Sequence, residues 1–209
     1  AASQLAAQTL QAVAAQIQIG MSTLDIDRLV RQDTARRGGT PSQLGYLGFP
    51  AAVCTSRNHV VCHGIPSSHE LLQDGDILNI DVTTAYKGFH GDTSITVVLG
   101  CASEESRRLV DIAERALWAG IEQARPGGRL GDIGAAISEL VRREGCSVVK
   151  DFGGQGIGRR MHMDPHVSHV GVRGQGIRLK PGMTFTIEPM VNLGSPEICV
   201  LDDGWTVVT

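Results

Sequence analysis

Two aspartates on neighbouring segments of β-type sequence are the residues best suited to chemistry. Asp81 lies in the segment LNIDVT at 78–83, and Asp92 lies in the segment GDTSITV at 91–97. Both segments alternate polar with apolar residues and are rich in β-branched side chains, which predicts two strands joined as a hairpin. A turn centred near residues 86 and 87 would set Asp81 roughly opposite Asp92, where the carboxylates repel unless one is protonated or a cation lies between them. Because hard divalent cations prefer oxygen ligands, the pair predicts a metal site, and two unrelated surface acids are the alternative.

An internal repeat adds further chemical groups. The segment LQDGDILNID, which ends at Asp81, aligns without gaps with LKPGMTFTIE, which ends at Glu188. An H-x-x-P motif precedes each copy and contains His63 in the first and His162 in the second. A two-fold axis between duplicated halves would bring these groups together. Three carboxylates would then hold one or two divalent metals that polarise a carbonyl, while the histidines bind a substrate amide or transfer protons.

The elements that must position these groups also occur twice. Sequence rhythm predicts helices at about 1–18, 22–37, 103–124 and 130–144. A capping box that begins at Ser22 opens the second of them. Strands are expected near 52–55, 60–62, 147–150, 184–188, 198–201 and 206–208, in addition to the hairpin. We expect the apolar face of the hairpin, with Leu78, Ile80 and Val82, to pack beneath helices. A helix pair followed by strands, twice, predicts two fused halves.

Composition narrows the class of protein. The 209 residues carry a net charge of −3 and 42% of them are hydrophobic, but no apolar run reaches the roughly 20 residues that cross a bilayer. The slightly negative net charge favours neither nucleic acid nor an acidic membrane surface as a partner. The five cysteines form no CxxC pair, which argues against a disulfide framework and favours a reducing cytoplasm. We expect a cytoplasmic monomer that binds neither DNA nor a membrane.

Two other motifs are weaker signals. His162, His166 and His169 are close together, but Pro165 prevents the helical geometry of a zinc-binding HExxH site. The glycine-rich stretch 153–158 fits neither the dinucleotide-binding GxGxxG pattern nor a phosphate-binding P-loop. We interpret it as a place where backbones pack closely.

Five longer motifs are spread over nearly the whole chain. They are VCHGIP at 61–66, GDILNIDV at 75–82, GFHGDTS at 88–94, KPGMTFTIEPM at 180–190 and DGWT at 203–206. In these motifs the chain closely resembles the type I methionine aminopeptidases, a family of pita-bread metallopeptidases. The resemblance implies an α+β fold in which two pseudo-symmetric halves each pack a helix pair on a curved, mainly antiparallel sheet. It implies one catalytic domain over 1–209, with pseudo-repeats at about 1–100 and 101–209.

The resemblance also implies an activity and assigns its residues. The family removes the N-terminal methionine from nascent proteins and peptides when the second residue is small, and we consider ribosome association. By resemblance, the metal ligands are Asp81, Asp92 and Glu188, with Gln155 as a weak fourth ligand. His162 contacts the scissile amide as the catalytic histidine, and His63 contacts the substrate and assists proton transfer. The methionine pocket would be formed by Tyr46, Phe49, Cys54, Met161 and Trp205.

Two departures from the family pattern weaken the expected metal site. The family has a metal-binding histidine where this chain has Gln155, and an amide oxygen is a poorer ligand than imidazole for a transition metal. The family also carries a bridging glutamate on a strand beyond the position of Thr209, so we expect the last C-terminal strands and this ligand to be lacking. Such sites normally hold two cobalt, manganese, iron or zinc ions, and we expect one or none here.

These departures keep a second function open. The alternative is a degenerate pita-bread protein that binds peptides or partners with little or no hydrolysis. Cleavage before proline, as in relatives that share the fold, fits less well, because the His-Gly-Ile-Pro and Asp-Gly-Trp-Thr segments match the methionine-specific enzymes.

Overall fold

The computed structural model describes all 209 residues, which form two compact units. Unit 1 contains Ala1–Ser106, Gly158–Met161 and Cys199–Val208, and unit 2 contains Arg107–Ile157, His162–Ile198 and Thr209. The segment Cys199–Val208 therefore groups with the first part of the chain. Each unit has its own hydrophobic core. None of the helices combines the length and the apolar character that crossing a membrane requires.

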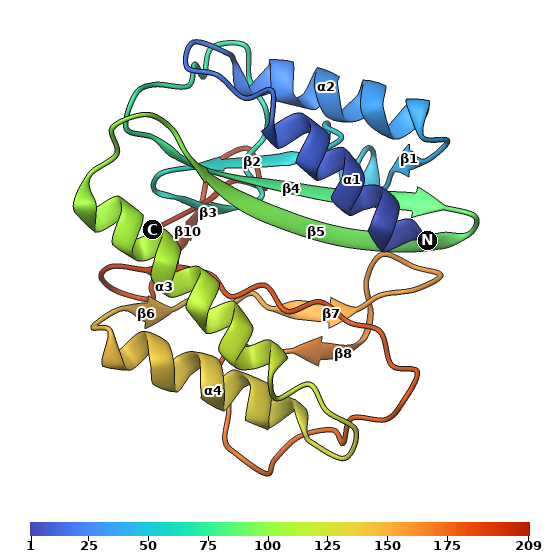
Figure 1. The fold of residues 1–209 in the computed structure, drawn as a ribbon, viewed down its shortest axis with the longest axis vertical. Coiled ribbons are helices and arrows are strands. Elements are labelled where there is room, and N and C mark those ends of the chain that lie inside the picture. Colours follow the sequence, from blue (N-terminus) through green and yellow to red (C-terminus); the bar gives the residue numbers. More distant parts are fainter. The chain divides into compact units, whose positions relative to one another are not determined.

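The two helices of unit 1 are α1 (Ala2–Ala14) and α2 (Thr23–Arg36), which pack against each other (Figure 1). The predicted capping box is confirmed, because the Ser22 hydroxyl accepts a hydrogen bond from the Asp25 backbone N–H and the Asp25 carboxylate accepts one from the Ser22 N–H. This exchange satisfies backbone donors that a helix start leaves without partners. The first helix is shorter than predicted and ends at Ala14.

An antiparallel four-stranded sheet forms the centre of unit 1. Its strands are β1 (Thr40–Pro41), β2 (Cys54–Arg57), β4 (Ile77–Tyr86) and β5 (Phe89–Val98). One edge of β4 pairs with β5, and the other edge pairs with β1 and β2 in succession along its length. A 3-10 turn, η1 (Tyr46–Gly48), lies between β1 and β2. A second sheet contains β3 (Val60–Cys62), β11 (Val207–Val208) and β10 (Cys199–Val200).

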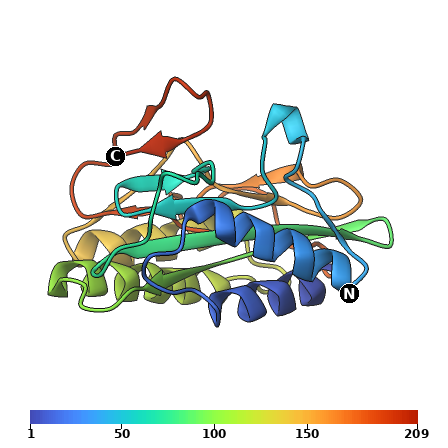
Figure 2. The same ribbon diagram turned by 90° about the horizontal axis from the view of Figure 1, so that it is seen from above.

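The apolar face of β4 packs into the core of unit 1, as predicted. Leu78, Ile80 and Val82 are fully buried and cluster with Val13 of α1 and Val30 of α2. Burying one such aliphatic side chain contributes about 1.5–3 kcal/mol. Figures 1 and 2 show α1 across the β4–β5 hairpin and α2 beside α1. Because both helices contribute to this core, the pair covers the apolar face and leaves the polar face to the candidate site.

Unit 2 has a second helix pair. Most of α3 (Glu104–Ile121) and all of α4 (Leu130–Arg143) belong to it, and Ile112 of α3 shares a core with Ile133 and Ile137 of α4. The helices approach closely at Gly120, where a Cβ would lie 2.7 Å from the Ile137 side chain. Four short strands complete this unit: β6 (Ser147–Val148), β7 (Gly154–Gly156), β8 (Met163–Val167) and β9 (Val191–Asn192), which pair as β6–β9 and β7–β8.

The structure around β7 contradicts one prediction about unit 2 and confirms another. The segment 184–188, predicted as a strand, has no regular strand and forms only a bridge between Phe185 and Gly156. The prediction of close backbone packing at the glycine-rich stretch is confirmed. A Cβ at Gly154 would lie 2.2 Å from the Thr186 carbonyl oxygen, and one at Gly156 would lie 2.2 Å from the Asp164 carbonyl oxygen.

Candidate active site

The two predicted aspartates lie on the central hairpin of unit 1, but not directly opposite each other. The register pairs Asp81 with Ser94 and Asp92 with Thr83. The predicted pairing was wrong because the turn is centred one residue later, at Lys87 and Gly88, which both have positive φ (50° and 76°). A shift of the turn centre by one residue changes the pairing by two. The aspartates therefore remain on one face as diagonal neighbours, with Cα atoms about 7 Å apart.

Each aspartate is held by a neighbouring polar side chain. The Thr83 hydroxyl donates a 2.9 Å hydrogen bond to Asp92 Oδ1. The Gln43 side-chain amide donates a 3.1 Å bond to the Asp81 carbonyl oxygen and lies 3.5 Å from Asp81 Oδ2. Neither Thr83 nor Gln43 was among the predicted site residues, because the sequence around them carries no signal of a metal or substrate contact.

The acid of unit 2, Glu188, is held in a similar way. The Thr186 hydroxyl donates a 2.5 Å bond to Glu188 Oε1 and accepts a 2.9 Å bond from the Gln155 backbone N–H. His169 Nε2 accepts a 3.0 Å bond from the Glu188 backbone N–H. Gln155 lies on β7, and Glu188 lies on the irregular segment beside it. The structure thus brings Gln155 and Glu188 to one part of unit 2 through Thr186.

His169 is a buried contact of this acid rather than a zinc ligand in a histidine cluster. Its side chain is 1% exposed, whereas His162 and His166 are exposed. Burial, together with the nearby charge of His166, lowers the pKa of His169 to about 4. The neutral ring can accept the Glu188 N–H at Nε2 because the proton is carried on Nδ1. Of the three histidines, His166 lies on the strand β8, His162 directly precedes it, and His169 follows it.

The donor chemistry of both units fits a hard divalent cation. Neither unit alone contains a group of three His, Cys, Asp or Glu side chains placed to hold a metal. However, the carboxylates of Asp92 and Glu188 each accept a hydrogen bond from a threonine hydroxyl. Carboxylates that are oriented in this way are typical metal ligands.

A small apolar cluster in unit 1 contains three of the five residues predicted for the methionine pocket. Phe49 and Cys54 are buried, and Trp205 packs against them with Ala51 and Ile65. The rings of Phe49 and Trp205 meet edge to face, with centroids 5.1 Å apart and an interplanar angle of 72°. This geometry is favourable for aromatic pairs.

The other predicted substrate contacts lie in unit 1 as well, except His162. The His63 ring is 6.2 Å from that of Trp205, and its backbone has a positive φ of 57°. Tyr46 begins η1, and its carbonyl oxygen accepts a 2.9 Å bond from the Phe49 N–H. Met161 is buried in unit 1 outside the apolar cluster, and His162 is assigned to unit 2.

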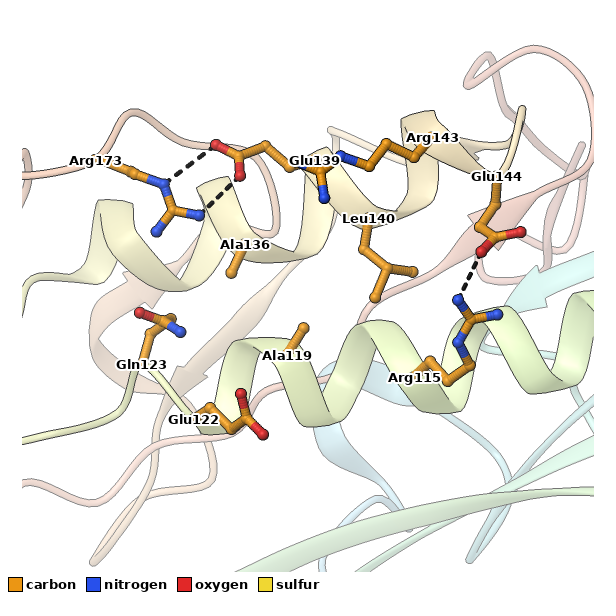
Figure 3. Close-up of a pocket in the computed structure, with 10 residues that line it drawn as sticks. All are labelled: Arg115, Ala119, Glu122, Gln123, Ala136, Glu139, Leu140, Arg143, Glu144 and Arg173. Carbon is orange, nitrogen blue, oxygen red and sulfur yellow. Dashed lines mark hydrogen bonds and ion pairs between the residues drawn. The ribbon is translucent and has the colours of Figure 1, made fainter.

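The pocket between α3 and α4 contains none of the predicted site residues. It has a volume of ≈ 340 Å³ and lies in unit 2 (Figure 3). Its charged lining is largely neutralised, because Arg115 pairs with Glu144 and Arg173 pairs with Glu139. Asp81 and Asp92 lie instead on the β4–β5 hairpin of unit 1, and Gln155 lies on β7 of unit 2.

Comparisons with known proteins agree over the whole chain. It is 48% identical over 208 residues to methionine aminopeptidase A of Synechocystis sp., covering 100% of this chain and 82% of the relative. It is 46% identical over 209 residues to the methionine aminopeptidase of Escherichia coli strain K12, covering 100% and 79%. The crystal structure of methionine aminopeptidase from Rickettsia prowazekii has a TM-score of 0.97 and 42% identity, covering 100% of this chain and 84% of that one.

These similarities confirm the predicted fold class and the resemblance found in the sequence. The architecture is the α+β pita-bread fold, because the neighbours that match it are pita-bread proteins. Residues 1–208 match the model of metallopeptidase family M24, and the chain belongs to this family.

Proposed function

We propose that this protein is a metalloexopeptidase that removes the N-terminal methionine from peptides and nascent proteins. The observation that carries the proposal is the identity of 44–48% to methionine aminopeptidases over essentially the full chain. Family M24 implies the use of divalent metal ions. The apolar cluster of Phe49, Cys54 and Trp205 supports a thioether side chain as the group that is recognised.

The proposed metal ligands are Asp81 and Asp92 from unit 1 and Glu188 and Gln155 from unit 2. We propose a single, weakly held ion of cobalt, manganese, iron or zinc, since Gln155 is a poorer ligand than histidine. When bound, the ion would supply Lewis-acid polarisation of the first peptide carbonyl and activation of water. Thr83 and Thr186 support this role because their hydroxyls orient two of the carboxylates.

The remaining residues would bind and orient the substrate. We propose that His162 hydrogen-bonds the scissile amide and that His63 contacts the substrate and assists proton transfer. The methionine side chain would lie among Phe49, Cys54 and Trp205, with Tyr46 and Met161 completing the pocket. The proposed substrates are those whose second residue is small, as in the family that the sequence motifs resemble.

A second candidate function is peptide or partner binding with little or no hydrolysis. The observation that favours it is Gln155, which stands on β7 next to the Thr186–Glu188 contact where a stronger ligand is expected. Loss of one ligand would lower metal affinity without changing the apolar cluster. Peptide recognition would then survive in a weak catalyst.

A hydrolysis assay combined with metal titration separates the two functions. The metal-free protein is titrated with cobalt or manganese by calorimetry, and cleavage of the peptide Met-Ala-Ser is followed in parallel. We expect saturable binding and cleavage that both increase in Gln155→His, and loss of both in Asp81→Asn. Asp111→Asn, an exposed surface change, serves as the control.

Two outcomes decide against the enzyme. No hydrolysis with any metal in either the wild type or Gln155→His would overturn the proposed activity. Saturable binding of Met-Ala-Ser without cleavage would establish the second candidate instead.

We further propose a cytoplasmic monomer that meets nascent chains at the ribosome. Size-exclusion chromatography with light scattering and ribosome co-sedimentation test those points.

A further inference from the structure

The side chain of Gln43 lies buried between the candidate acid of unit 1 and the apolar cluster. It follows β1 in the sequence, precedes η1, and is 7% exposed. Its Nε2 atom donates to the Asp81 carbonyl oxygen at 3.1 Å and lies 3.5 Å from Asp81 Oδ2 and 3.6 Å from Cys54 Sγ. Its Oε1 atom accepts the Thr83 backbone N–H at 3.4 Å. One buried carboxamide therefore contacts the aspartate, its strand and the pocket wall.

The orientation of this carboxamide follows from its partners. Nε2 carries two hydrogens, so one can go to the Asp81 carbonyl oxygen and the other can be shared between the carboxylate and Cys54 Sγ. A flipped amide would set its oxygen against two acceptors of Asp81 and its NH₂ against the Thr83 N–H. Only the observed orientation satisfies the group.

Gln43 fills a gap in the hydrogen bonding of β4. On that edge, β1 pairs with Thr84 and Ala85, Ser42 donates to the Thr83 carbonyl oxygen at 2.8 Å, and β2 begins at the Cys54–Asp81 pair. Between these partners the side chain of Gln43 binds main-chain groups of Thr83 and Asp81 as a neighbouring peptide group would. The contact fixes the backbone from which the Asp81 side chain projects.

The same carboxamide reaches the recognition cluster. Cys54 is the residue of β2 that pairs with Asp81, and it belongs to the cluster with Phe49 and Trp205. Since Gln43 lies six residues before Phe49, it also anchors the start of the loop that carries Phe49. A change in Gln43 would therefore disturb the acid and the pocket together.

We propose that Gln43 is a positioning residue that holds the Asp81 carboxylate and couples it to the Cys54 wall of the methionine pocket. Metal affinity and side-chain discrimination then depend on one carboxamide. The inference rests on the proposed function, because it uses Asp81 as a metal ligand and the apolar cluster as the side-chain pocket.

The test replaces the carboxamide by an apolar group of similar length. The full chain is prepared as wild type, Gln43→Met and the control Gln73→Met, an exposed glutamine of unit 1 given the same change. Manganese affinity is measured by calorimetry, and kcat/KM is measured for Met-Ala-Ser and for norleucine-Ala-Ser. Thermal melting shows that all comparisons are made on folded protein.

We expect Gln43→Met to weaken manganese binding about tenfold, as loss of an orienting contact to a metal ligand does. We also expect the preference for methionine over norleucine to change by about threefold or more, because the wall at Cys54 loses its polar neighbour. Gln73→Met should match the wild type in both measurements. A folded Gln43→Met with wild-type affinity and wild-type preference would overturn the proposal, since a purely structural role lowers only the melting temperature.

Two further measurements keep the test decisive. If Gln43→Met does not fold, Gln43→Asn keeps the carboxamide but shortens it by one methylene, and the same losses are expected because the group no longer reaches Asp81. Unchanged binding and preference in Gln43→Asn would then count against the proposal. If even the wild type fails to cleave the peptide, the proposed function fails. Manganese affinity and methionine binding, followed by Trp205 fluorescence, still decide the role of Gln43.

Discussion

Thr83 lies directly opposite Asp92 across the β4–β5 hairpin, and its hydroxyl donates a 2.9 Å hydrogen bond to the carboxylate. Thr83 occupies the position opposite Asp92 at which the sequence alone predicted Asp81. Asp92 therefore has a polar neighbour that fixes its orientation, while Asp81 lies diagonally across the hairpin. A cation between the two acids would be held by one carboxylate supported by Thr83 and one supported by Gln43.

The first prediction concerns this threonine. Thr83→Val keeps the shape of the side chain but removes the hydroxyl, so Asp92 loses its donor. We expect manganese affinity, measured by calorimetry, to fall about tenfold. Thr96→Val is the matched control, because Thr96 lies on the same hairpin but its hydroxyl accepts from Asn79. Equal affinities in the two variants would show that Thr83 does not orient a metal ligand.

The second prediction tests the close packing of β7 in unit 2. Gly154→Ala places a Cβ 2.2 Å from the Thr186 carbonyl oxygen, whereas a Cβ at Gly194 meets nothing within 4 Å. We expect Gly154→Ala to lower the free energy of unfolding by about 3 kcal/mol or more, and Gly194→Ala to change it by less than about 1 kcal/mol. Urea denaturation measures both. Similar stabilities would mean that the backbone at β7 relaxes without loss.

The third prediction uses the two tryptophans as reporters. Trp205 packs against Phe49 in the proposed pocket, while Trp118 is 57% exposed on α3 in unit 2. In Trp118→Phe, where Trp205 is the remaining tryptophan, we expect L-methionine to change the emission spectrum saturably. In Trp205→Phe the emission of Trp118 should not respond. A response from Trp118 alone would move the binding site away from the Phe49 cluster.

The fourth prediction concerns Asp76, a buried carboxylate of unit 1. Burial by itself would raise the pKa of Asp76, but hydrogen bonds from Asn58 and Gln73 and the Arg57 guanidinium hold the pKa below its usual value. Because the pKa is lower in the folded state than in the unfolded chain, the unfolded state takes up protons more readily. The stabilisation is therefore complete above about pH 4 and is lost as the pH falls through the folded-state pKa.

Asp76→Asn tests this dependence. We expect the substitution to lower the free energy of unfolding by about 2 kcal/mol at pH 7, since Arg57 and the backbone donor lose a charged acceptor. The difference from the wild type should shrink as the pH falls toward 3. Asp111→Asn, which alters a surface ion pair with Arg115, should change stability by less than about 0.5 kcal/mol at any pH. A pH-independent difference for Asp76→Asn would contradict the charge-based explanation.

Local patterns predicted the features that depend on neighbouring residues. The capping box at Ser22 and the buried alternation of Leu78, Ile80 and Val82 follow from hydrogen bonding and side-chain direction within one element. The sequence placed Asp81 and Asp92 on strands that the structure contains, whereas the strand predicted for Glu188 is an irregular segment. Each of these inferences needs only a few consecutive residues.

The register of the strands and the hydrogen-bond partners of the site residues depend on contacts between residues that are distant in the sequence. Only the tertiary structure decided these two features. The turn at Lys87 and Gly88 moved Asp92 opposite Thr83, because both turn residues adopt positive φ and the strands continue to Tyr86 and Phe89. Gln43 reaches Asp81 because β4 changes partner between β1 and β2. The sequence thus determined which residues are chemically capable. The three-dimensional contacts determined which carboxylate each polar side chain holds, because such contacts join segments whose approach no local periodicity encodes.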